Sequence, residues 1–431
     1  MTSKGDAAGG DGAYDVIVAG GGAAGVGAAV GAVRAGARTL LLERTAALGG
    51  AATARNVSTF CGLYTCRPDA RPAVGGVAKE VVDLLHQRGG ASPMTRVSDD
   101  HAVVFVDPEA VKAALDDVVA AEPRLDLLFG AQVSDAERDG HRLVGVGVST
   151  FGGRHLRLEA SAFVDATGDG VLAALGGAAV FTAAKGSRQT ATLGVRFGGI
   201  SSEADVSVPT VKEAVRAAIR SGAGPLTSST GLVHRLPVSN DVIAYLADED
   251  LDALDAVAYT AAIQHARRQA RAYLEVLRSL PGCDGAYLVS TGPELGIRQS
   301  RDVVTRRPLA DEDLTQGLVD AETVAMAAWP SEFHPGVGLP SEWLSIGGAG
   351  AFGITLDNLR SVDTGNLFAA GRLLGGDLRA AASVRVLGTS FATGQAAGVA
   401  AAHLARSEAV DGLPTAPVRH DLERQGAVLS L

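Results

Sequence analysis

Near the start of the chain, apolar and polar positions alternate in a pattern that predicts a strand, a glycine turn, a helix and a second strand. An apolar run over residues 16–19 predicts the first strand, and helical spacing over residues 23–35 predicts the helix. A second apolar run over residues 39–42 ends in Glu43. The turn has the spacing Gly20-x-Gly22-x-x-Gly25. This order is typical of a βαβ unit that binds a dinucleotide.

Each part of this unit has a physical role. Gly20 permits the tight turn, Gly22 lets the backbone approach a pyrophosphate, and Gly25 allows the helix to pack closely on the strand. The helix N-terminus offers free N–H groups and partial positive charge to the phosphates. Glu43 can accept hydrogen bonds from both ribose hydroxyls. We therefore expect dinucleotide binding here.

The rest of the pattern predicts further elements. Helical spacing is found at residues 77–87, 109–121, 208–220, 250–280 and 389–404, and Asp107-Pro108 is expected to cap the second of these helices. Alternating runs predict a small antiparallel meander, and other apolar runs predict single strands. The meander is expected at 125–129, 133–137, 143–150 and 155–158, and the single strands at 101–106, 162–165 and 366–371.

This succession predicts an α/β fold with two domains. We expect residues 14–180 and 345–431 to form one doubly wound, Rossmann-like domain assembled from both ends of the chain, with the meander attached. Residues 181–344, which carry more charges and long helical patterns, are expected to form an inserted α+β substrate domain. Residues 1–13, rich in Gly, Ala and Asp, are expected to be a disordered tail.

Composition narrows the class of protein. The chain has 431 residues, of which 47% are hydrophobic, and its formal net charge of -10 argues against nucleic acid or an anionic membrane as a partner. Its three cysteines are too few for a disulfide scaffold and favour a reducing compartment. No signal peptide or membrane span is visible, so we expect a cytoplasmic protein. No residue spacing suggests a metal site or a hydrolase.

Several further motifs give the chain a family resemblance. They are Leu48-Gly-Gly50, Phe105-Val-Asp-Pro108, the run from Phe163 to Gly170, the run from Leu295 to Arg301, Asn366-Leu-Phe-Ala-Ala-Gly-Arg372, Arg385-Val-Leu-Gly388 and Gly394-Gln-Ala-Ala-Gly398. With the N-terminal glycine motif, they make the chain similar to the FAD-dependent oxidoreductases of the two-dinucleotide-binding-motif flavoproteins, whose FAD domain is like that of glutathione reductase. One departure is Gly353-Ile-Thr-Leu-Asp-Asn358, where relatives often carry Ile-Pro-Tyr.

The resemblance implies FAD as the cofactor and a set of contacts for it. Gly20, Gly22, Ala24 and Gly25 would hold the pyrophosphate, and Glu43, with Arg44 beside it, the adenosine ribose. The resemblance also implies that Val133 meets the adenine, that Ala166 and Gly168 pass under the dinucleotide, and that Gly371 and Arg372 lie beside the ribityl chain and the phosphate. Gly50 is expected among these contacts. The helix N-terminus at Gly388, Thr389 and Ser390 would point at the pyrimidine edge of the flavin.

Cys61 and Cys66 lie in the long loop after Gly50, which in relatives runs toward the flavin. Their spacing is similar to the redox pair of flavin disulfide reductases, although Cys61 lies eleven positions after Gly50 and no second nicotinamide-binding fingerprint is visible. A cysteine–flavin bond and plain burial of both thiols are the other hypotheses. Tyr64, between them, is either a proton or hydrogen-bond donor or a packing residue.

Arg298, Arg301 and Arg385 are candidates for binding an anionic substrate, because arginine holds carboxylates in bidentate geometry. The alternative is that they form structural ion pairs with Glu294, Asp302 or Asp377. His234 and His334 are candidates for a general base or for structural roles.

These observations predict an FAD-dependent dehydrogenase or oxidase that moves hydride between a small polar, possibly carboxylate-bearing metabolite and flavin N5. Two alternatives are a flavin-dependent monooxygenase using NAD(P)H and oxygen, and a non-catalytic flavin-binding redox subunit. The sequence leaves the electron acceptor and the oligomeric state open.

Overall fold

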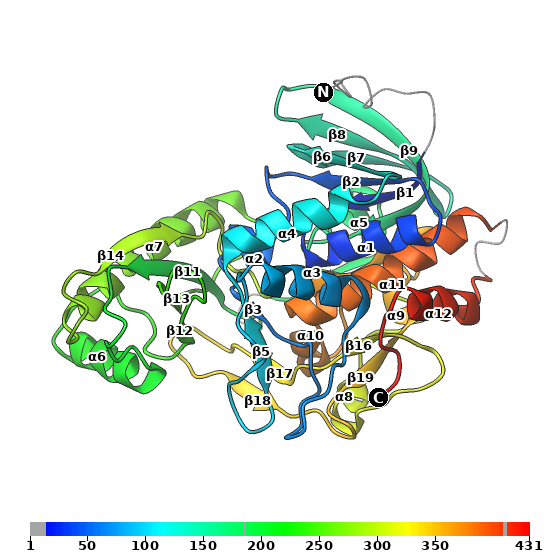
Figure 1. Ribbon diagram of the computed structural model, residues 1–431. Helices are drawn as coiled ribbons and strands as arrows, with labels where there is room; N and C mark the ends of the chain where they lie inside the picture. Colours follow the sequence, from blue (N-terminus) through cyan, green and yellow to red (C-terminus); the bar gives the residue numbers. More distant parts are fainter. Residues whose placement is uncertain (1–13, 185–186, 408–411) are drawn as a thin grey trace.

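The computed structural model describes residues 14–184, 187–407 and 412–431, which form a larger body and a smaller one beside it (Figure 1). The larger body contains elements from both ends of the chain, and the smaller one, in green, comes from the middle. The expected tail, residues 1–13, lies outside the described residues. Among the described helices, none has the length and apolar character needed to cross a membrane.

Parallel strands form the centre of the larger body, in the order β6-β2-β1-β9, with β20 pairing on the far side of β9. Helix α1 joins β1 to β2, since parallel neighbours need a crossover connection. The expected α/β, Rossmann-like architecture is therefore confirmed. The strands are β1 (Tyr14–Ala19), β2 (Thr39–Glu43), β6 (Leu125–Phe129), β9 (His155–Asp165) and β20 (Leu367–Ala369).

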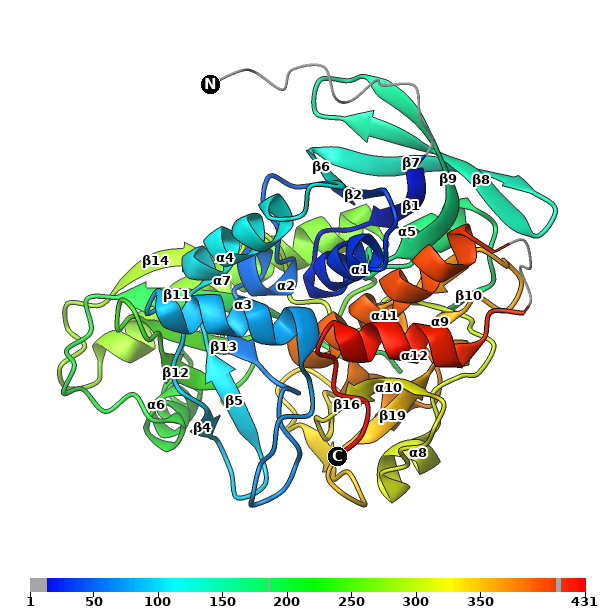
Figure 2. The same ribbon diagram turned by 45° about the vertical axis from the view of Figure 1, so that its right-hand side comes forward.

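Two helices from opposite ends of the chain pack backbone to backbone. They are α1 (Ala23–Arg34) and α11 (Leu387–Ala405), coloured blue and orange in Figure 2. A Cβ atom at Gly394 would lie 2.0 Å from the Ala24 carbonyl oxygen, and one at Gly398 would lie 1.9 Å from the Ala28 carbonyl oxygen. Glycine at these two positions is required by the close approach of the helices, as the small residues of the predicted last helix indicated.

The meander differs from the prediction in two respects. Residues 125–129 form β6, which pairs in parallel with β2 and belongs to the central sheet. The predicted strands at 155–158 and 162–165 are one strand, β9, whose first half pairs with β8 and whose second half pairs with β1. The antiparallel meander therefore consists of β7 (Ala131–Asp139), β8 (Arg142–Thr150) and the first half of β9. An alternating pattern shows a half-exposed strand but not its partner, which explains both errors.

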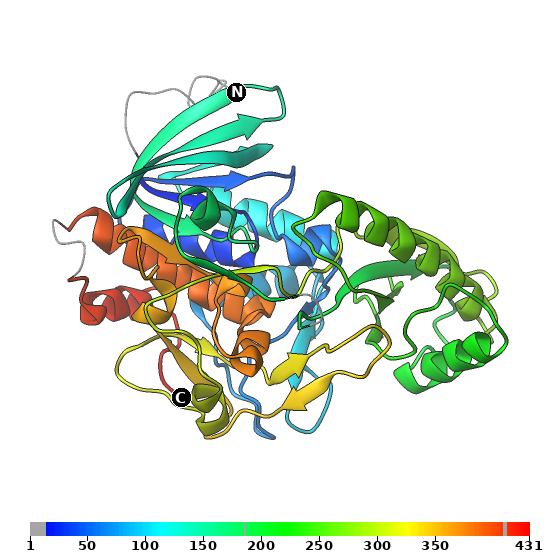
Figure 3. The same cartoon turned by 180° about the vertical axis from the view of Figure 1, so that it is seen from behind.

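The smaller body is a four-stranded antiparallel sheet, β12-β13-β11-β14, covered by two helices (Figure 3). It has a hydrophobic core of its own, formed by residues between 191 and 297. Helix α7 begins later than predicted, because the Asp255 carboxylate accepts hydrogen bonds from the N–H groups of Val257 and Ala258 and so caps the helix. The elements are β11 (Ala191–Gly198), α6 (Val208–Arg220), β12 (Val233–Arg235), β13 (Val242–Glu249), α7 (Ala256–Arg278) and β14 (Tyr287–Thr291).

The other elements pack around the central sheet. The substrate domain was expected to span residues 181–344. In the structure, however, apolar residues between 303 and 346 pack into the core of the larger body. The exact division between domains stays a prediction. The elements are α2 (Ala51–Ala54), β3 (Thr59–Phe60), α3 (Gly76–Gln87), β4 (Thr95–Arg96), β5 (Ala102–Phe105), α4 (Pro108–Ala120), α5 (Val171–Leu175), β10 (Val180–Thr182), β15 (Arg301–Val303), α8 (Asp311–Gln316), β16 (Thr323–Ala327), β17 (Ser331–Phe333), β18 (Glu342–Leu344), β19 (Phe352–Thr355), α9 (Leu356–Leu359), α10 (Leu378–Val384) and α12 (Thr415–Arg424).

Candidate functional site

A cavity of about 860 Å³ is lined by residues of both bodies. Most residues that the resemblance assigned to the cofactor lie on its wall, and the larger part of them follow the ends of β1, β2, β9 and β20. In open α/β sheets, ligands bind outside the carboxyl ends of the parallel strands. The predicted residues on the wall are Gly20, Gly22, Ala24, Glu43, Arg44, Gly50, Val133, Ala166, Gly168, Gly371, Arg372 and Ser390.

The three glycines of the turn are required for different reasons. A Cβ atom at Gly20, whose φ is +100°, would lie 2.5 Å from the Ala166 carbonyl oxygen, and one at Gly25 would lie 1.6 Å from the Gly20 carbonyl oxygen. Protein contacts alone therefore demand glycine at both positions. At Gly22 the nearest atom to an added Cβ is the Gly50 Cα, 3.9 Å away, and the residue faces the cavity. The free space beside Gly22 fits a pyrophosphate that must approach the backbone.

Glu43 is buried at the end of β2 and shapes the turn. Its Oε2 atom accepts a hydrogen bond from the Gly21 N–H (2.7 Å), while Oε1 accepts from the N–H and the hydroxyl of Thr45, both at 2.7 Å. A carboxylate has about four lone-pair sites, so acceptor capacity remains for a ribose hydroxyl. Arg44, next in the chain, forms an ion pair with Glu294 of the smaller body.

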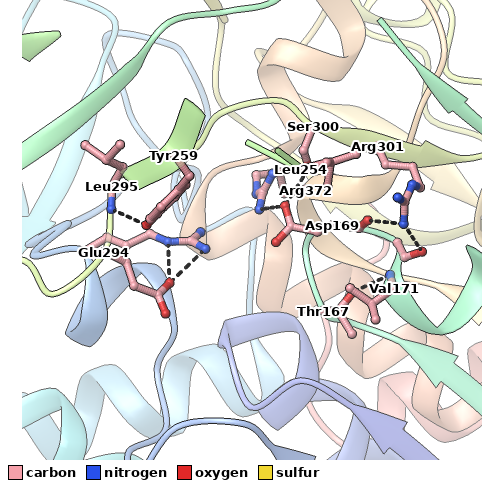
Figure 4. Close-up of polar contacts among 12 residues, drawn as sticks. Thr167, Asp169, Val171, Leu254, Tyr259, Glu294, Leu295, Ser300, Arg301 and Arg372 are labelled. Carbon is pink, nitrogen blue, oxygen red and sulfur yellow. Dashed lines mark hydrogen bonds and ion pairs between the residues drawn. The ribbon is translucent and has the colours of Figure 1, made fainter. Parts of the chain in front are cut away.

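Charged side chains are paired around Asp169 (Figure 4). Arg372 donates to the Asp169 carboxylate at 2.8 Å and to the Ser300 hydroxyl at 3.0 Å. Burial by itself would raise the pKa of Asp169, but Arg372 and Arg55 hold it well below its usual range. Arg55 also pairs with Glu294 at 3.2 Å. With Arg44, three arginines lie at this end of the cavity beside the carboxylates of Glu43, Asp169 and Glu294, and arginine is a residue type that binds phosphate groups.

The N-terminus of α11 meets the cavity through Ser390. Gly388 and Thr389 do not line it but pack on the loop of residues 61 and 62, where the Gly388 N–H donates to the Cys61 carbonyl oxygen at 2.9 Å. The Thr389 hydroxyl is buried without a hydrogen-bond partner. Gly25 also lies off the wall, in the contact between helix and strand.

Two of the three candidate arginines, Arg298 and Arg385, line the same cavity. Arg298 donates to the Thr190 carbonyl oxygen at 2.7 Å and to the Thr192 hydroxyl at 2.8 Å. Arg385 donates through Nη2 to the Glu332 carbonyl oxygen at 2.7 Å, and its Nε is buried without a partner. Burial and the neighbouring Arg298 lower the pKa of Arg385 to about 10, so Arg385 remains charged at neutral pH. Arg298 is charged as well, because arginine is not deprotonated in proteins.

Glu332 and His334 lie beside these two arginines. We call Arg298, Arg385, Glu332 and His334 the charged group. Burial would raise the pKa of Glu332, but the hydrogen bond with His334 and the charges of Arg385 and Arg298 lower it to about 2. Burial and Arg298 lower the pKa of His334 to about 4. His334 lies 3.4 Å from the Glu332 carboxylate through Nε2 and 3.2 Å from the Ser341 hydroxyl through Nδ1. At neutral pH the four side chains therefore carry one net positive charge.

The remaining candidates have different surroundings. Arg301 points away from the cavity wall and donates to the carbonyl oxygens of Asp169 and Gly170. Tyr64 lies outside the wall too, where burial and the Asp83 carboxylate raise its pKa. Two of the carboxylates proposed as ion-pair partners of these arginines bind other groups. Glu294 pairs with Arg44 and Arg55, and the Asp377 carboxylate accepts from the Asp311 N–H.

The cysteines are all free. Cys61 lines the cavity, and burial and the Glu332 charge raise the pKa of its thiol to about 12. Cys66 is buried, and its thiol donates to the Ala328 carbonyl oxygen at 3.4 Å. His234 lies behind the wall, stacked on Phe105 with 4.4 Å between ring centroids.

Sequence reasoning missed several wall residues: Arg55, His101, Asp248, Trp329, Glu332 and Trp343. The chain has two tryptophans, and both are among them. Their rarity was the signal that could have drawn attention to these positions. Among the described residues, no group of three or more His, Cys, Asp or Glu side chains is placed to hold a metal ion.

Solved structures similar to this chain include three that span nearly all of it. The crystal structure of a geranylgeranyl bacteriochlorophyll reductase-like protein from Thermoplasma acidophilum matches 96% of this chain and 84% of its own, at 11% identity and a TM-score of 0.50. GidA of Aquifex aeolicus matches 91% of this chain and 64% of its own, at 15% identity and a TM-score of 0.47. CabE, an aromatic hydroxylase from angucycline biosynthesis, matches 96% and 66%, at 14% identity and a TM-score of 0.47. The Thermoplasma likeness shows a shared fold.

A family model described as FAD dependent oxidoreductase matches residues 15–422. The chain therefore belongs to the FAD-dependent oxidoreductase family, is an enzyme, and uses FAD as its cofactor.

Proposed function

We propose that this member of the FAD-dependent oxidoreductase family is a dehydrogenase or oxidase for a small metabolite that carries a carboxylate. The observation behind this proposal is the pair Arg298 and Arg385 on the wall of the cavity that also contains the glycine turn. Arginine binds carboxylates through charge-assisted hydrogen bonds, often in bidentate geometry. A substrate carboxylate in the cavity would therefore pair with these two guanidinium groups.

The residues of the glycine turn would hold the cofactor, with Gly22 against the pyrophosphate and Glu43 against the ribose. When bound, FAD supplies a ring system that accepts a hydride at N5. Arg372, already oriented by Asp169 and Ser300, would add positive charge beside the phosphates. These assignments fit the space beside Gly22 and the closeness of the Arg372 guanidinium to Gly168.

Substrate oxidation also releases a proton, and His334 is placed to take it. Because its pKa is lowered to about 4, the imidazole is neutral at neutral pH and can act as a base. Glu332, 3.4 Å away, would stabilise the imidazolium that forms. Arg298 and Arg385 would meanwhile orient the carboxylate, so the charged group would both bind the substrate and move its proton.

The test is anaerobic mixing of the FAD-loaded enzyme with a panel of small hydroxy and amino carboxylates, followed by the visible flavin band. Bleaching is expected with some of them. The variant Arg385→Met should raise the concentration needed for half-maximal bleaching at least about tenfold, which is the loss of ~1.4 kcal/mol of binding. Arg301→Met, an arginine outside the wall, is the matched control and should leave that concentration unchanged.

Other outcomes would contradict the proposal. NAD(P)H consumption that rises with an aromatic or aliphatic substrate, without anaerobic bleaching by that substrate, would indicate a monooxygenase. Bound flavin that no donor reduces would indicate a redox subunit. The electron acceptor is open, and a cytoplasmic location, expected from the cysteine content, stays a prediction.

A further inference from the structure

Three aromatic rings from separate segments form one side of the cavity. His101 precedes β5, Trp329 follows β16, and Trp343 lies in β18. The three rings contact one another. The His101 centroid lies 5.5 Å from Trp329 and 5.7 Å from Trp343, on which it is stacked at an interplanar angle of 19°, and the two indoles meet edge to face with centroids 6.3 Å apart. We call these three side chains the aromatic wall.

The aromatic wall is in direct contact with the charged group through Glu332. The Trp329 indole N–H donates to the Glu332 carboxylate at 3.4 Å. In the β17–β18 hairpin, Glu332 is directly opposite Trp343, and directly opposite residues project their side chains on the same face of a sheet. Glu332 is also bonded to Arg385 through its carbonyl oxygen. One continuous surface therefore carries rings at one end and arginines at the other.

The two tryptophans of the aromatic wall differ in solvent exposure. Trp329 is 5% exposed and packs against Val103 and Val386. Trp343 is 51% exposed, although it lines the cavity. Burial lowers the pKa of His101, against the opposing effect of the Asp100 and Glu332 carboxylates, and so favours the neutral ring. An aromatic ring offers a flat face, which favours another flat ring over a saturated group of similar size.

We propose that the substrate is an aromatic carboxylic acid, with its ring against the aromatic wall and its carboxylate at Arg298 and Arg385. The carboxylate half of this assignment rests on the proposed function, whereas the ring half rests on the wall alone. Trp343, at the exposed end, is a specificity-determining residue for the ring.

The test measures calorimetric binding of three probes to the FAD-loaded enzyme: benzoate, cyclohexanecarboxylate and benzyl alcohol. Benzoate is expected to bind at least about threefold more tightly than cyclohexanecarboxylate, the range that aromatic pairing gives beyond buried area. Trp343→Ala should weaken benzoate binding about fivefold and cyclohexanecarboxylate binding less, and Trp343→Phe should restore most of the loss. Retention of FAD by each variant shows that it is folded, and Trp343 is exposed enough for the substitution to leave the core intact.

The outcomes separate the two proposals. Equal affinity for benzoate and cyclohexanecarboxylate, or undiminished benzoate binding by Trp343→Ala, overturns the aromatic substrate and leaves the carboxylate site standing. Benzyl alcohol binding as tightly as benzoate, with no effect of Arg385→Met, overturns the carboxylate site and leaves the aromatic wall as a ring site. Failure of all three probes to bind overturns both proposals.

Discussion

The Glu43 carboxylate holds the glycine turn by accepting a hydrogen bond from the Gly21 N–H, with 2.7 Å between Oε2 and N. The end of β2 and the turn after β1 are thus tied together by protein groups alone. Glu43 therefore has two roles, one in shaping the turn and a proposed one in binding the ribose, and substitutions can separate them.

We expect Glu43→Gln to weaken FAD binding about tenfold, or ~1.4 kcal/mol, and to lower the free energy of unfolding by about 1 kcal/mol. The amide oxygen can still accept from the Gly21 N–H, but the amide NH2 then replaces the acceptor of the Thr45 N–H, and the negative charge that strengthens hydrogen bonds from ribose hydroxyls is lost. FAD titration of the apoprotein and thermal unfolding measure the two effects. Glu43→Ala serves as the comparison, since it leaves the Gly21 N–H without an acceptor and should lower the melting temperature. Unchanged FAD affinity in Glu43→Gln would remove the ribose role.

Gly22→Ala and Gly25→Ala should fail in different ways. Gly22 has an ordinary φ of -71°, and its Cβ would meet only the Gly50 Cα at 3.9 Å, so the apoprotein should fold normally and lose FAD affinity. The Gly25 Cβ would lie 1.6 Å from the Gly20 carbonyl oxygen, so Gly25→Ala should unfold at a lower temperature even without FAD. Circular dichroism and flavin content of the purified variants distinguish these results. A Gly22→Ala enzyme with full FAD content would show that the pyrophosphate lies elsewhere.

The cysteines should be inert in the native enzyme. Only the thiolate reacts with a disulfide reagent, and burial raises the pKa of Cys61 and of Cys66 to about 12. We expect labelling near pH 8 to be slow until urea unfolds the chain, when all three cysteines react.

The flavin should not be attached to a cysteine, so acid precipitation should release free FAD into the supernatant. Flavin retained in the pellet, and released by Cys61→Ser, would instead establish a cysteine–flavin bond.

Stability should fall as the pH drops from about 6.5 to about 4. An unfolded histidine has a pKa near 6.5, while burial lowers the pKa of His234 and of His334 to about 4. In that window the unfolded chain binds protons that the folded chain does not, so acid favours unfolding. His234→Gln, which can keep a hydrogen bond to the Ser58 hydroxyl, should reduce the slope of melting temperature against pH. An equal slope in both proteins would assign the acid sensitivity to other groups.

The elements predicted correctly are those whose bounds depend on their own residues, such as a helical period or a capping side chain. Helix α6 has its predicted bounds, and Asp107 caps α4 by accepting from the Glu109 N–H at 2.9 Å. By contrast, β6 was assigned to the meander because alternation does not reveal a strand's neighbour.

The residues of the candidate site also fall into those that the sequence predicted and those that it did not. The glycine turn and Glu43 could be found because their spacing is local, over one βαβ unit. Glu332 lies opposite Trp343 because both belong to one hairpin. The contact of Trp343 with His101 and the hydrogen bond from Arg385 to Glu332 arise from tertiary packing. No spacing along the chain encodes such contacts, so these residues could be recognised only in the folded structure.

The crossing of α1 and α11 has a consequence for synthesis of the chain on the ribosome. Gly394 and Gly398 fit against the Ala24 and Ala28 carbonyl oxygens, so the buried face of α1 is covered only after α11 has been made. The smaller body, whose core lies within residues 191–297, is synthesised between these two helices. We therefore expect the smaller body to fold on the ribosome before the larger one, with the buried face of α1 exposed to chaperones until α11 emerges.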